Sequence, residues 1–255
     1  YIDGALKMQK QALRSATSTV NKVSFFMDGT NTGTFYVDNI RVYTEPPLML
    51  NEKFDSLPTD ATPGSPWTVV STGGGSVTVK EVPFPADKSI KVQKLNTSGT
   101  SSLTTTVADQ SGRVAFEAKL MARESAGSKA TGYIYNSGGT TVASILFEDG
   151  NIKAYVGGTK TTVQPFDPDV WYRVRIVIDT NTDKFDLFVD GVRKMNDQAL
   201  RNATTTVNKV SYFMDGTNTG TLYVDNVRIY NEAAYIGTAP TPIFPARGMR
   251  ARLNP

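Results

Sequence analysis

The sequence predicts an all-β protein, built as an antiparallel two-sheet β-sandwich. Threonine and valine, which favour the pleated strand surface, are abundant, and glycine, asparagine and aspartate supply turns between short runs. Residues 113–124 and 171–180 alternate apolar and polar side chains, which is the period of a strand with one buried face. About a dozen such runs follow one another at short spacing, a pattern typical of a sandwich or closed barrel.

One segment of the chain occurs twice. Residues 188–232 align with residues 1–45 without a gap, and 32 of the 45 positions are identical. Residue 188 aligns with residue 1, so the offset is 187 residues, far beyond the roughly 50 residues of a solenoid repeat but ordinary for a whole domain. We therefore expect a slice of a tandem array, in which a sandwich is preceded by the C-terminal quarter of an identical-type module.

The repeat sets the expected domain boundaries. Residues 1–45 are predicted to be the C-terminal strands of a preceding repeat, and residues 46–50 a linker stiffened by two prolines. Residues 51–232 should form the complete β-sandwich module. The proline-rich segment 233–255 is expected to be an extended tail or linker.

Within the module, strands are expected wherever apolar residues alternate or cluster between turn residues. They are predicted near 77–82, 89–94, 101–107 and 113–124, in a meander over 132–158, over 171–180 and in the repeated segment. Arg173 and Arg175 should point outward from their strand. The side chains expected to be buried are Val114, Phe116, Leu120, Trp171, Val174, Ile176, Leu187 and Val224.

Four motifs in order resemble one superfamily. They are FDSLPTDATPGSPW, RVAFEAKLMA, DVWYRVRIVIDTNTDKFDLFVDG and GTLYVDNVRIY. Together they are similar to the concanavalin A-like jelly-roll superfamily, and most similar to the laminin-G-like modules found in large secreted bacterial enzymes and surface proteins. The resemblance covers residues 51–232 and implies a jelly roll, but it leaves the ligand open because the superfamily spans lectins, glycosidases, lyases and spacers.

Composition excludes several kinds of chemistry. The chain has no histidine and no cysteine, which removes imidazole and thiol catalysis and disulfides. Its 27 basic and 24 acidic residues give a net charge of +3, too even to suggest a nucleic-acid partner, and no apolar run is long enough to span a membrane.

The carboxylates do not predict catalysis. The glycosidases of the superfamily carry carboxylates at alternate positions of one strand, where an acid and a nucleophile flank the scissile bond. Here Glu117 and Glu124 fall on opposite faces of a regular strand, and so do the adjacent Glu148 and Asp149. With no histidine for a lyase mechanism either, we expect that the chain is not an enzyme.

The resemblance also implies a structural calcium ion, because sandwich carbohydrate-binding modules often hold one between their first and last strands. Glu52 and Asp55 lie at the start and Asp225 near the end, on strands that are commonly neighbours in a jelly roll. Carboxylate oxygens are ligands that Ca²⁺ prefers. The alternative is that Asp225 caps a turn or bulge by bonding to its own backbone.

Two groups of residues are candidates for sugar binding. Tyr133 and Tyr135 share a strand face and would form either an aromatic platform or half of the core. Lys119, Arg173 and Arg175 point outward and would form a basic patch for an acidic polysaccharide, unless they pair with Glu117 and Asp186 across strands.

The resemblance implies a carbohydrate-binding or spacer module of a bacterial protein that is extracellular or at the cell surface, and the residues themselves predict that the module is not catalytic and is repeated in tandem. Its expected partners are a polysaccharide and neighbouring copies of the same module. The alternative is a structural or adhesive repeat of a surface layer or filament, in which tandem copies supply length and avidity.

Overall fold

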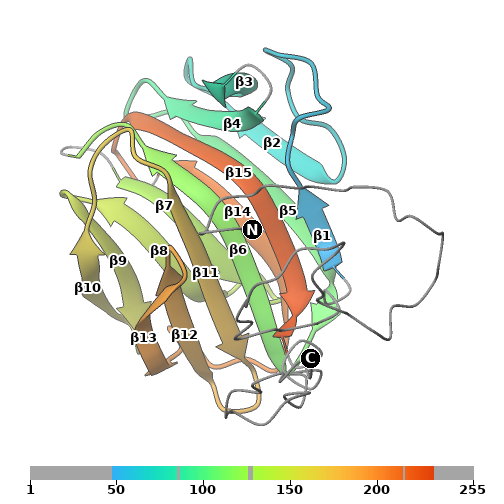
Figure 1. Ribbon diagram of the computed structural model, residues 1–255, viewed down its shortest axis with the longest axis vertical. Coiled ribbons are helices and arrows are strands. Elements are labelled where there is room, and N and C mark those ends of the chain that lie inside the picture. Colours follow the sequence, from blue (N-terminus) through green and yellow to red (C-terminus); the bar gives the residue numbers. More distant parts are fainter. Residues whose placement is uncertain (1–47, 85–86, 126–128, 215, 233–255) are drawn as a thin grey trace, which may run out of the picture. The chain divides into compact units, whose positions relative to one another are not determined.

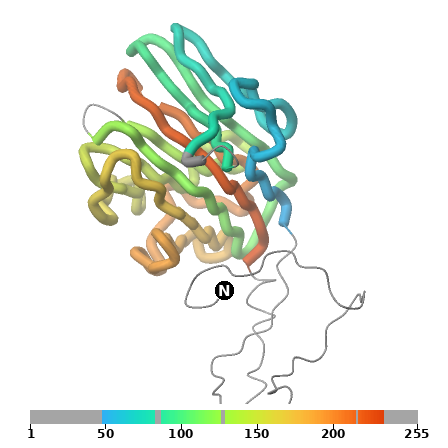
Figure 2. Tube along the Cα trace, turned by 45° about the horizontal axis from the view of Figure 1, so that its top comes forward, coloured from blue at the N-terminus to red at the C-terminus, as the bar shows by residue number. Residues whose placement is uncertain are grey.

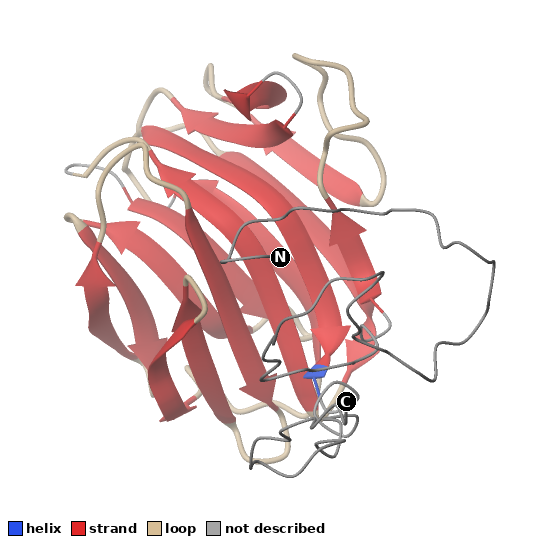
Figure 3. Cartoon of the chain, in the orientation of Figure 1, coloured by secondary structure: helices blue, strands red, loops and turns tan. Residues whose placement is uncertain are grey.

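The computed structural model describes residues 48–232, apart from 85–86, 126–128 and 215. Strands and their connecting loops account for nearly all of this range, which confirms the all-β prediction (Figure 3). Within it, no helix is long and apolar enough to cross a membrane. The predictions for residues 1–45 and 233–255 concern segments outside the described range.

The strands form two antiparallel sheets, which Figure 1 shows as two layers. The first, called sheet I, has the order β13-β12-β11-β6-β15-β4-β3, and β1 also pairs with β15. Its strands are β1 (Leu48–Glu52), β3 (Ser76–Phe84), β4 (Asp87–Lys94), β6 (Arg113–Ala122), β11 (Tyr172–Asp179), β12 (Lys184–Val189), β13 (Val192–Ala199) and β15 (Gly220–Asn231).

The second sheet, called sheet II, has seven strands in the order β10-β9-β8-β7-β14-β5-β2. They are β2 (Trp67–Ser71), β5 (Ser101–Gln110), β7 (Lys129–Tyr135), β8 (Thr141–Glu148), β9 (Asn151–Val156), β10 (Thr159–Pro165) and β14 (Val207–Met214). Sequential strands alternate between the sheets at several points, as expected of a jelly roll.

Tight turns hold the hairpins in register. The two central residues of the β8–β9 turn are Asp149 (φ 51°) and Gly150 (φ 70°), and those of the β12–β13 turn are Asp190 (φ 52°) and Gly191 (φ 79°). A two-residue turn with positive φ at both positions has the twist that right-handed strands require, and Asp-Gly is a favoured pair for it. The local sequence therefore determines which side chains of these strands face the core.

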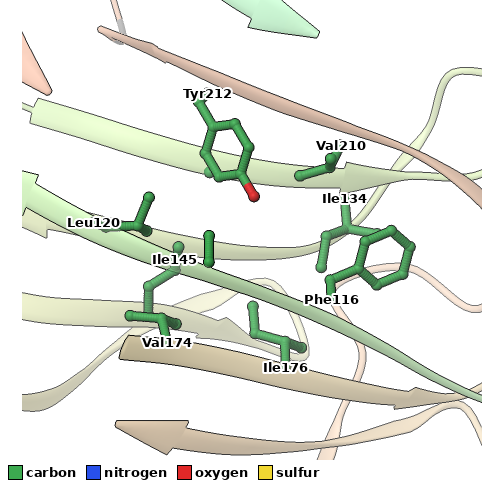
Figure 4. A pocket seen from close by; sticks show the side chains of 10 residues that line it. Phe116, Leu120, Ile134, Ile145, Val174, Ile176, Val210 and Tyr212 are labelled. Carbon is green, nitrogen blue, oxygen red and sulfur yellow. The ribbon is translucent and has the colours of Figure 1, made fainter. Parts of the chain in front are cut away.

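The core lies between the two sheets. Side chains from both sheets enclose a cavity of about 20 Å³, lined by Phe116 and Leu120 from sheet I and Ile134, Ile145 and Tyr212 from sheet II among others (Figure 4). As predicted, Val114, Phe116, Leu120, Val174, Ile176, Leu187 and Val224 are all buried.

The prediction that Trp171 is buried in the core is wrong. Trp171 is only half-buried and contacts Tyr223 on the outer surface of sheet I, with 6.5 Å between ring centroids. It lies one residue before β11, at the same parity as the outward-facing Arg173, so the strand's alternation carries it outward. Trp67, the other tryptophan, is buried against Phe54.

The first and last strands of the module are neighbours. β1 pairs with the second half of β15, from Leu48 opposite Tyr230 to Glu52 opposite Val227, and Figure 2 shows the blue start of the module beside its red end. β1 thus begins at Leu48, inside the segment 46–50 that was expected to be a linker. Its apolar residues, which follow the prolines directly, complete the edge of sheet I.

Candidate functional site

The three basic residues predicted to form a patch do lie together. Lys119 of β6 is opposite Arg173 of β11, and Arg175 lies two residues further along the same face. This surface, the outer side of sheet I, also carries Glu117, Asp225 and Arg228, and we call it the charged face.

Each of these cations has an acidic partner. Arg173 donates to Oε1 of Glu117 from Nε (3.1 Å) and Nη2 (2.8 Å), and Arg175 donates from Nη1 to Glu232 (2.9 Å). Nζ of Lys119 is 3.9 Å from Oδ2 of Asp225. Of the two cross-strand partners considered as alternatives, Glu117 pairs with Arg173, whereas Asp186 pairs with Arg113 (3.2 Å).

The acidic partners are the buried members of these pairs. The Glu117 side chain is 5% exposed and the Asp225 side chain 1%, whereas those of Arg173 and Lys119 are 56% and 42% exposed. The carboxylates are therefore held in the sheet surface by cations that reach over them. The charged face is an alternating network of charges rather than a purely basic patch.

Asp225 lies at a bulge in β15. The register with β6 shifts between Asp225 and Arg228, and Asn226 has a positive φ of 50°. The backbone N–H of Asn226 donates to Oδ1 of Asp225 (2.6 Å), which is the bulge cap considered as the alternative to calcium. Burial raises the pKa of the Asp225 carboxyl to about 7, against the opposing effects of Asn226 and Lys119.

The other two residues predicted to bind calcium make local contacts. Oε1 of Glu52 accepts the backbone N–H groups of Lys53 (3.0 Å) and Phe54 (2.8 Å), and Oδ1 of Asp55 accepts that of Lys88 (3.0 Å). Among the described residues no group of three or more acidic side chains is placed to hold a metal ion. The calcium ion stays a prediction.

Tyr133 and Tyr135 lie on the opposite side of the molecule, on the outer surface of sheet II. Their rings are 6.1 Å apart, and the Tyr133 ring meets that of Phe213 edge-on at 4.9 Å. The Arg201 guanidinium lies 4.2 Å from the centre of the Tyr155 ring and 5.5 Å from that of Tyr133. We call this surface, formed by the following six residues, the aromatic face: Tyr133, Tyr135, Tyr155, Arg201, Lys209 and Phe213.

The predicted binding residues thus form two separate surfaces. Lys119, Arg173 and Arg175 belong to the charged face, and Tyr133 and Tyr135 belong to the aromatic face on the other sheet. Sequence reasoning missed Arg201, which precedes β14 in a loop, and Phe213, which lies in a run of consecutive apolar residues. Phe213 could have been found from the alternation along β14, because Lys209, Ser211 and Phe213 are two residues apart and share one face of the strand.

The residues named on these faces are largely identical in the two copies of the repeated segment. Six of its 13 differences fall at exposed positions, which are 192, 193, 196, 197, 202 and 205. Arg201, Lys209 and Phe213 of the aromatic face have identical counterparts in Arg14, Lys22 and Phe26. On the charged face the counterparts of Asp225 and Arg228 are Asp38 and Arg41.

Comparison with known proteins shows the fold. No family model and no curated protein sequence matches the chain. Solved structures do: a sialidase matches 73% of this chain at 12% identity and a TM-score of 0.62, although the matched part spans only 19% of the sialidase. The cellulose-induced protein Cip1 matches 71% of this chain and 96% of its own length, at 12% identity and a TM-score of 0.57.

A family 16 glycosyl hydrolase from Mycobacterium smegmatis is also similar. It matches 72% of this chain and all of its own length, at 15% identity and a TM-score of 0.51. At such identities the likeness establishes a jelly-roll sandwich of the concanavalin type.

These similarities contradict the prediction that the chain is not an enzyme. That prediction required two carboxylates on one strand, yet proteins described as a sialidase and as glycoside hydrolases share this fold. In the sheet, carboxylates from different strands can meet on one face, as Glu117 of β6 and Asp225 of β15 do here. A search along single strands could not find that combination.

Proposed function

We propose that this module binds a polysaccharide across the aromatic face. The observation that carries the proposal is the grouping of four aromatic side chains with two cations on one outer sheet surface. Aromatic rings offer flat apolar surfaces against which the C–H faces of sugar rings can stack, while neighbouring polar groups bond to hydroxyls.

The aromatic face also offers hydrogen-bond donors. Nη1 of Arg201 and the hydroxyl of Ser144, which is opposite Tyr133 in the register, are buried without a partner among the described residues. Buried polar groups are usually paired, so an orphan donor beside half-buried aromatic rings favours a ligand that supplies acceptors. Sugar hydroxyls and carboxylates both do so.

The size of the aromatic face favours an extended ligand. Tyr155 lies on β9 and Phe213 on β14, three strand spacings away, or about 15 Å at 4.8 Å per strand. That distance exceeds a single sugar ring. With Arg201 and Lys209 on this surface, we propose an acidic polysaccharide outside the cell, bound by tandem copies whose combined avidity exceeds the affinity of one module.

A matched pair of substitutions tests this proposal. Tyr155 of the aromatic face lies under Arg201 (4.2 Å), and Phe188 of the charged face lies under Arg175 (4.0 Å), so the two rings have similar surroundings. In affinity electrophoresis through gels containing pectin or other polysaccharides, Tyr155→Ala should lose retardation and Phe188→Ala should keep it. Equal retardation of both variants would contradict the assignment to the aromatic face.

Glycoside hydrolysis is a second candidate, favoured by the carboxylates of the charged face. Glycosidases use two carboxyl groups about 5–10 Å apart, one of them protonated at the working pH. Asp225, with its pKa raised to about 7, would be the acid, and Glu117, diagonal to it on the neighbouring strand, the second carboxylate. Release of reducing ends from a polysaccharide panel, abolished by Asp225→Asn, would support this candidate, and no release by the wild type would reject it.

A further inference from the structure

A depression on the charged face is lined by residues that neither proposed function uses. It has a volume of about 330 Å³ and is lined by Val82, Met121, Arg123, Asp169, Trp171 and Tyr223. Such a volume is at the lower end of the range for small-molecule sites. The depression lies on the sheet opposite to the aromatic face.

The floor and wall of the depression are apolar and aromatic. Met121 and Tyr223 are opposite each other on β6 and β15 and are 5% and 7% exposed, and the ring of Trp171 meets that of Tyr223 edge-on. The depression is thus lined by an aromatic pair beside the aliphatic side chains of Met121 and Val82. A sugar ring fits such a surface because one of its faces consists of C–H groups.

Trp171 also supplies an unsatisfied donor. Its indole Nε1 is buried and has no hydrogen-bond partner among the described residues. A buried donor left without an acceptor costs free energy comparable to a lost hydrogen bond. An acceptor on a molecule in the depression would remove that cost.

The rim of the depression is an ion pair fixed by the backbone. Nε of Arg123 donates to Oδ1 of Asp169 (3.0 Å), and both side chains are about half exposed. Asp169 has a positive φ of 59°, and its N–H donates to the carbonyl of Ala122 (3.0 Å), which holds the loop before β11 against the end of β6. The pair presents donors and acceptors side by side without net charge.

We propose that this depression binds one neutral hexopyranose unit, as a site separate from the aromatic face. The sugar ring would lie on Trp171 and Tyr223, one hydroxyl would accept from the indole N–H, and neighbouring hydroxyls would pair with Arg123 and Asp169. A neutral sugar is favoured because Asp169 already neutralises Arg123. Tyr223 has an identical counterpart, Tyr36, in the repeated segment.

The test is calorimetric titration of the chain with glucose, galactose, mannose and galacturonate, together with tryptophan emission. Trp67 is buried in the core, so a change in emission reports on Trp171. Arg123→Ala should weaken binding of the neutral sugar about tenfold, the effect of losing one or two hydrogen bonds. Trp171→Phe, which keeps an aromatic ring and removes the indole N–H, should weaken it by about fivefold.

Tyr155→Ala is the control that separates the two proposals. It should lose polysaccharide retention and keep wild-type affinity for the neutral sugar, so either proposal can fail alone. The inference is overturned if no neutral hexose binds the wild type, if only galacturonate binds, or if Arg123→Ala leaves the affinity for the neutral sugar unchanged.

Discussion

The two outer faces of the sandwich use charge in opposite ways. On the charged face the carboxylates of Glu117, Asp225 and Glu232 are almost completely buried, and the cations bond to them from above. On the aromatic face the cations Arg201 and Lys209 lie over the rings of Tyr155 and Tyr135, at 4.2 and 4.6 Å. The acidic groups of sheet I are therefore buried in its outer surface, whereas the cations of sheet II lie against aromatic rings.

Because of this difference, we expect the two faces to contribute differently to the free energy of unfolding and to polysaccharide binding. Removing one partner of a buried ion pair leaves an uncompensated charge and costs much more than losing an exposed pair. Substitutions of the buried carboxylates on the charged face, or of the cations that pair with them, should therefore lower the free energy of unfolding or alter its pH dependence. Substitutions of the rings and cations on the aromatic face should change polysaccharide affinity with smaller effects on folding.

The largest expected effect concerns Asp225. Its carboxyl keeps a proton up to about pH 7 in the folded protein, against a usual pKa of 3.8. Between these values the folded state binds a proton that the unfolded chain has released, so stability falls as pH rises through this window. The full shift corresponds to about 4 kcal/mol at 1.36 kcal/mol per unit, and Asp225→Asn should remove most of this slope in urea unfolding between pH 4 and 8.

The same titration also tests the calcium prediction. If Ca²⁺ binds Asp225 together with Glu52 and Asp55, added calcium should stabilise the wild type at pH 8, where Asp225 is charged, but not Asp225→Asn. An equal response of the two proteins would remove Asp225 from any calcium site. Equal pH slopes without calcium would contradict the buried-acid interpretation.

A somewhat smaller loss is expected for Arg173→Ala. It would leave the buried carboxylate of Glu117 without its nearest partner (2.8 Å), since Arg228 is 3.7 Å away, and should lower the free energy of unfolding by about 3 kcal/mol. The matched control is Lys184→Ala, which breaks an exposed pair with Asp197 and should cost less than about 0.5 kcal/mol. Similar losses in urea unfolding would mean that the charged face is not a buried network.

An effect of about 1.4 kcal/mol, or tenfold in affinity, is expected for Arg201→Ala in polysaccharide binding. The matched substitution on the other face is Arg175→Ala, which also removes a guanidinium from an aromatic ring. Arg175→Ala should leave the affinity for polysaccharide unchanged. Binding by the wild type should weaken in high salt, because exposed charges are screened within about 10 Å at 0.1 M. The reverse ranking in affinity electrophoresis would move the binding site to the charged face.

Much of the charged face was predictable because strand alternation has a strict period of two. Val114, Phe116 and Leu120 face the core, so Glu117 and Lys119 had to face outward. In β15 the spacing of the buried Val224 and Val227 is three rather than two, which is the sequence signature of the bulge at Asn226.

The partners across the sheet could not be predicted in this way. Glu232 bonds to Arg175, 57 residues earlier in the chain, and the pairing depends on the order of strands in the sheet. Likewise, Arg201 reaches the aromatic face from a loop, where no periodicity determines the direction of a side chain. Strand order and loop conformation are tertiary properties, so local patterns carry no signal for them.

The smallest expected effect lies in the core between the two faces, at Tyr212. Its hydroxyl borders the 20 Å³ cavity, whose other lining side chains are apolar, and no hydrogen bond to it is found among the described residues (Figure 4). Burial raises the pKa of Tyr212. The other copy of the repeated segment has phenylalanine at the aligned position, Phe25. Because Tyr212→Phe removes a buried polar group without creating a larger void, it should leave the free energy of unfolding unchanged or raise it by up to about 1 kcal/mol.

Urea unfolding measures the effect of Tyr212→Phe on stability. Polysaccharide retention is the second readout, and it should not change. A loss above about 1 kcal/mol would mean that the hydroxyl bonds to a water molecule in the cavity, which has room for one.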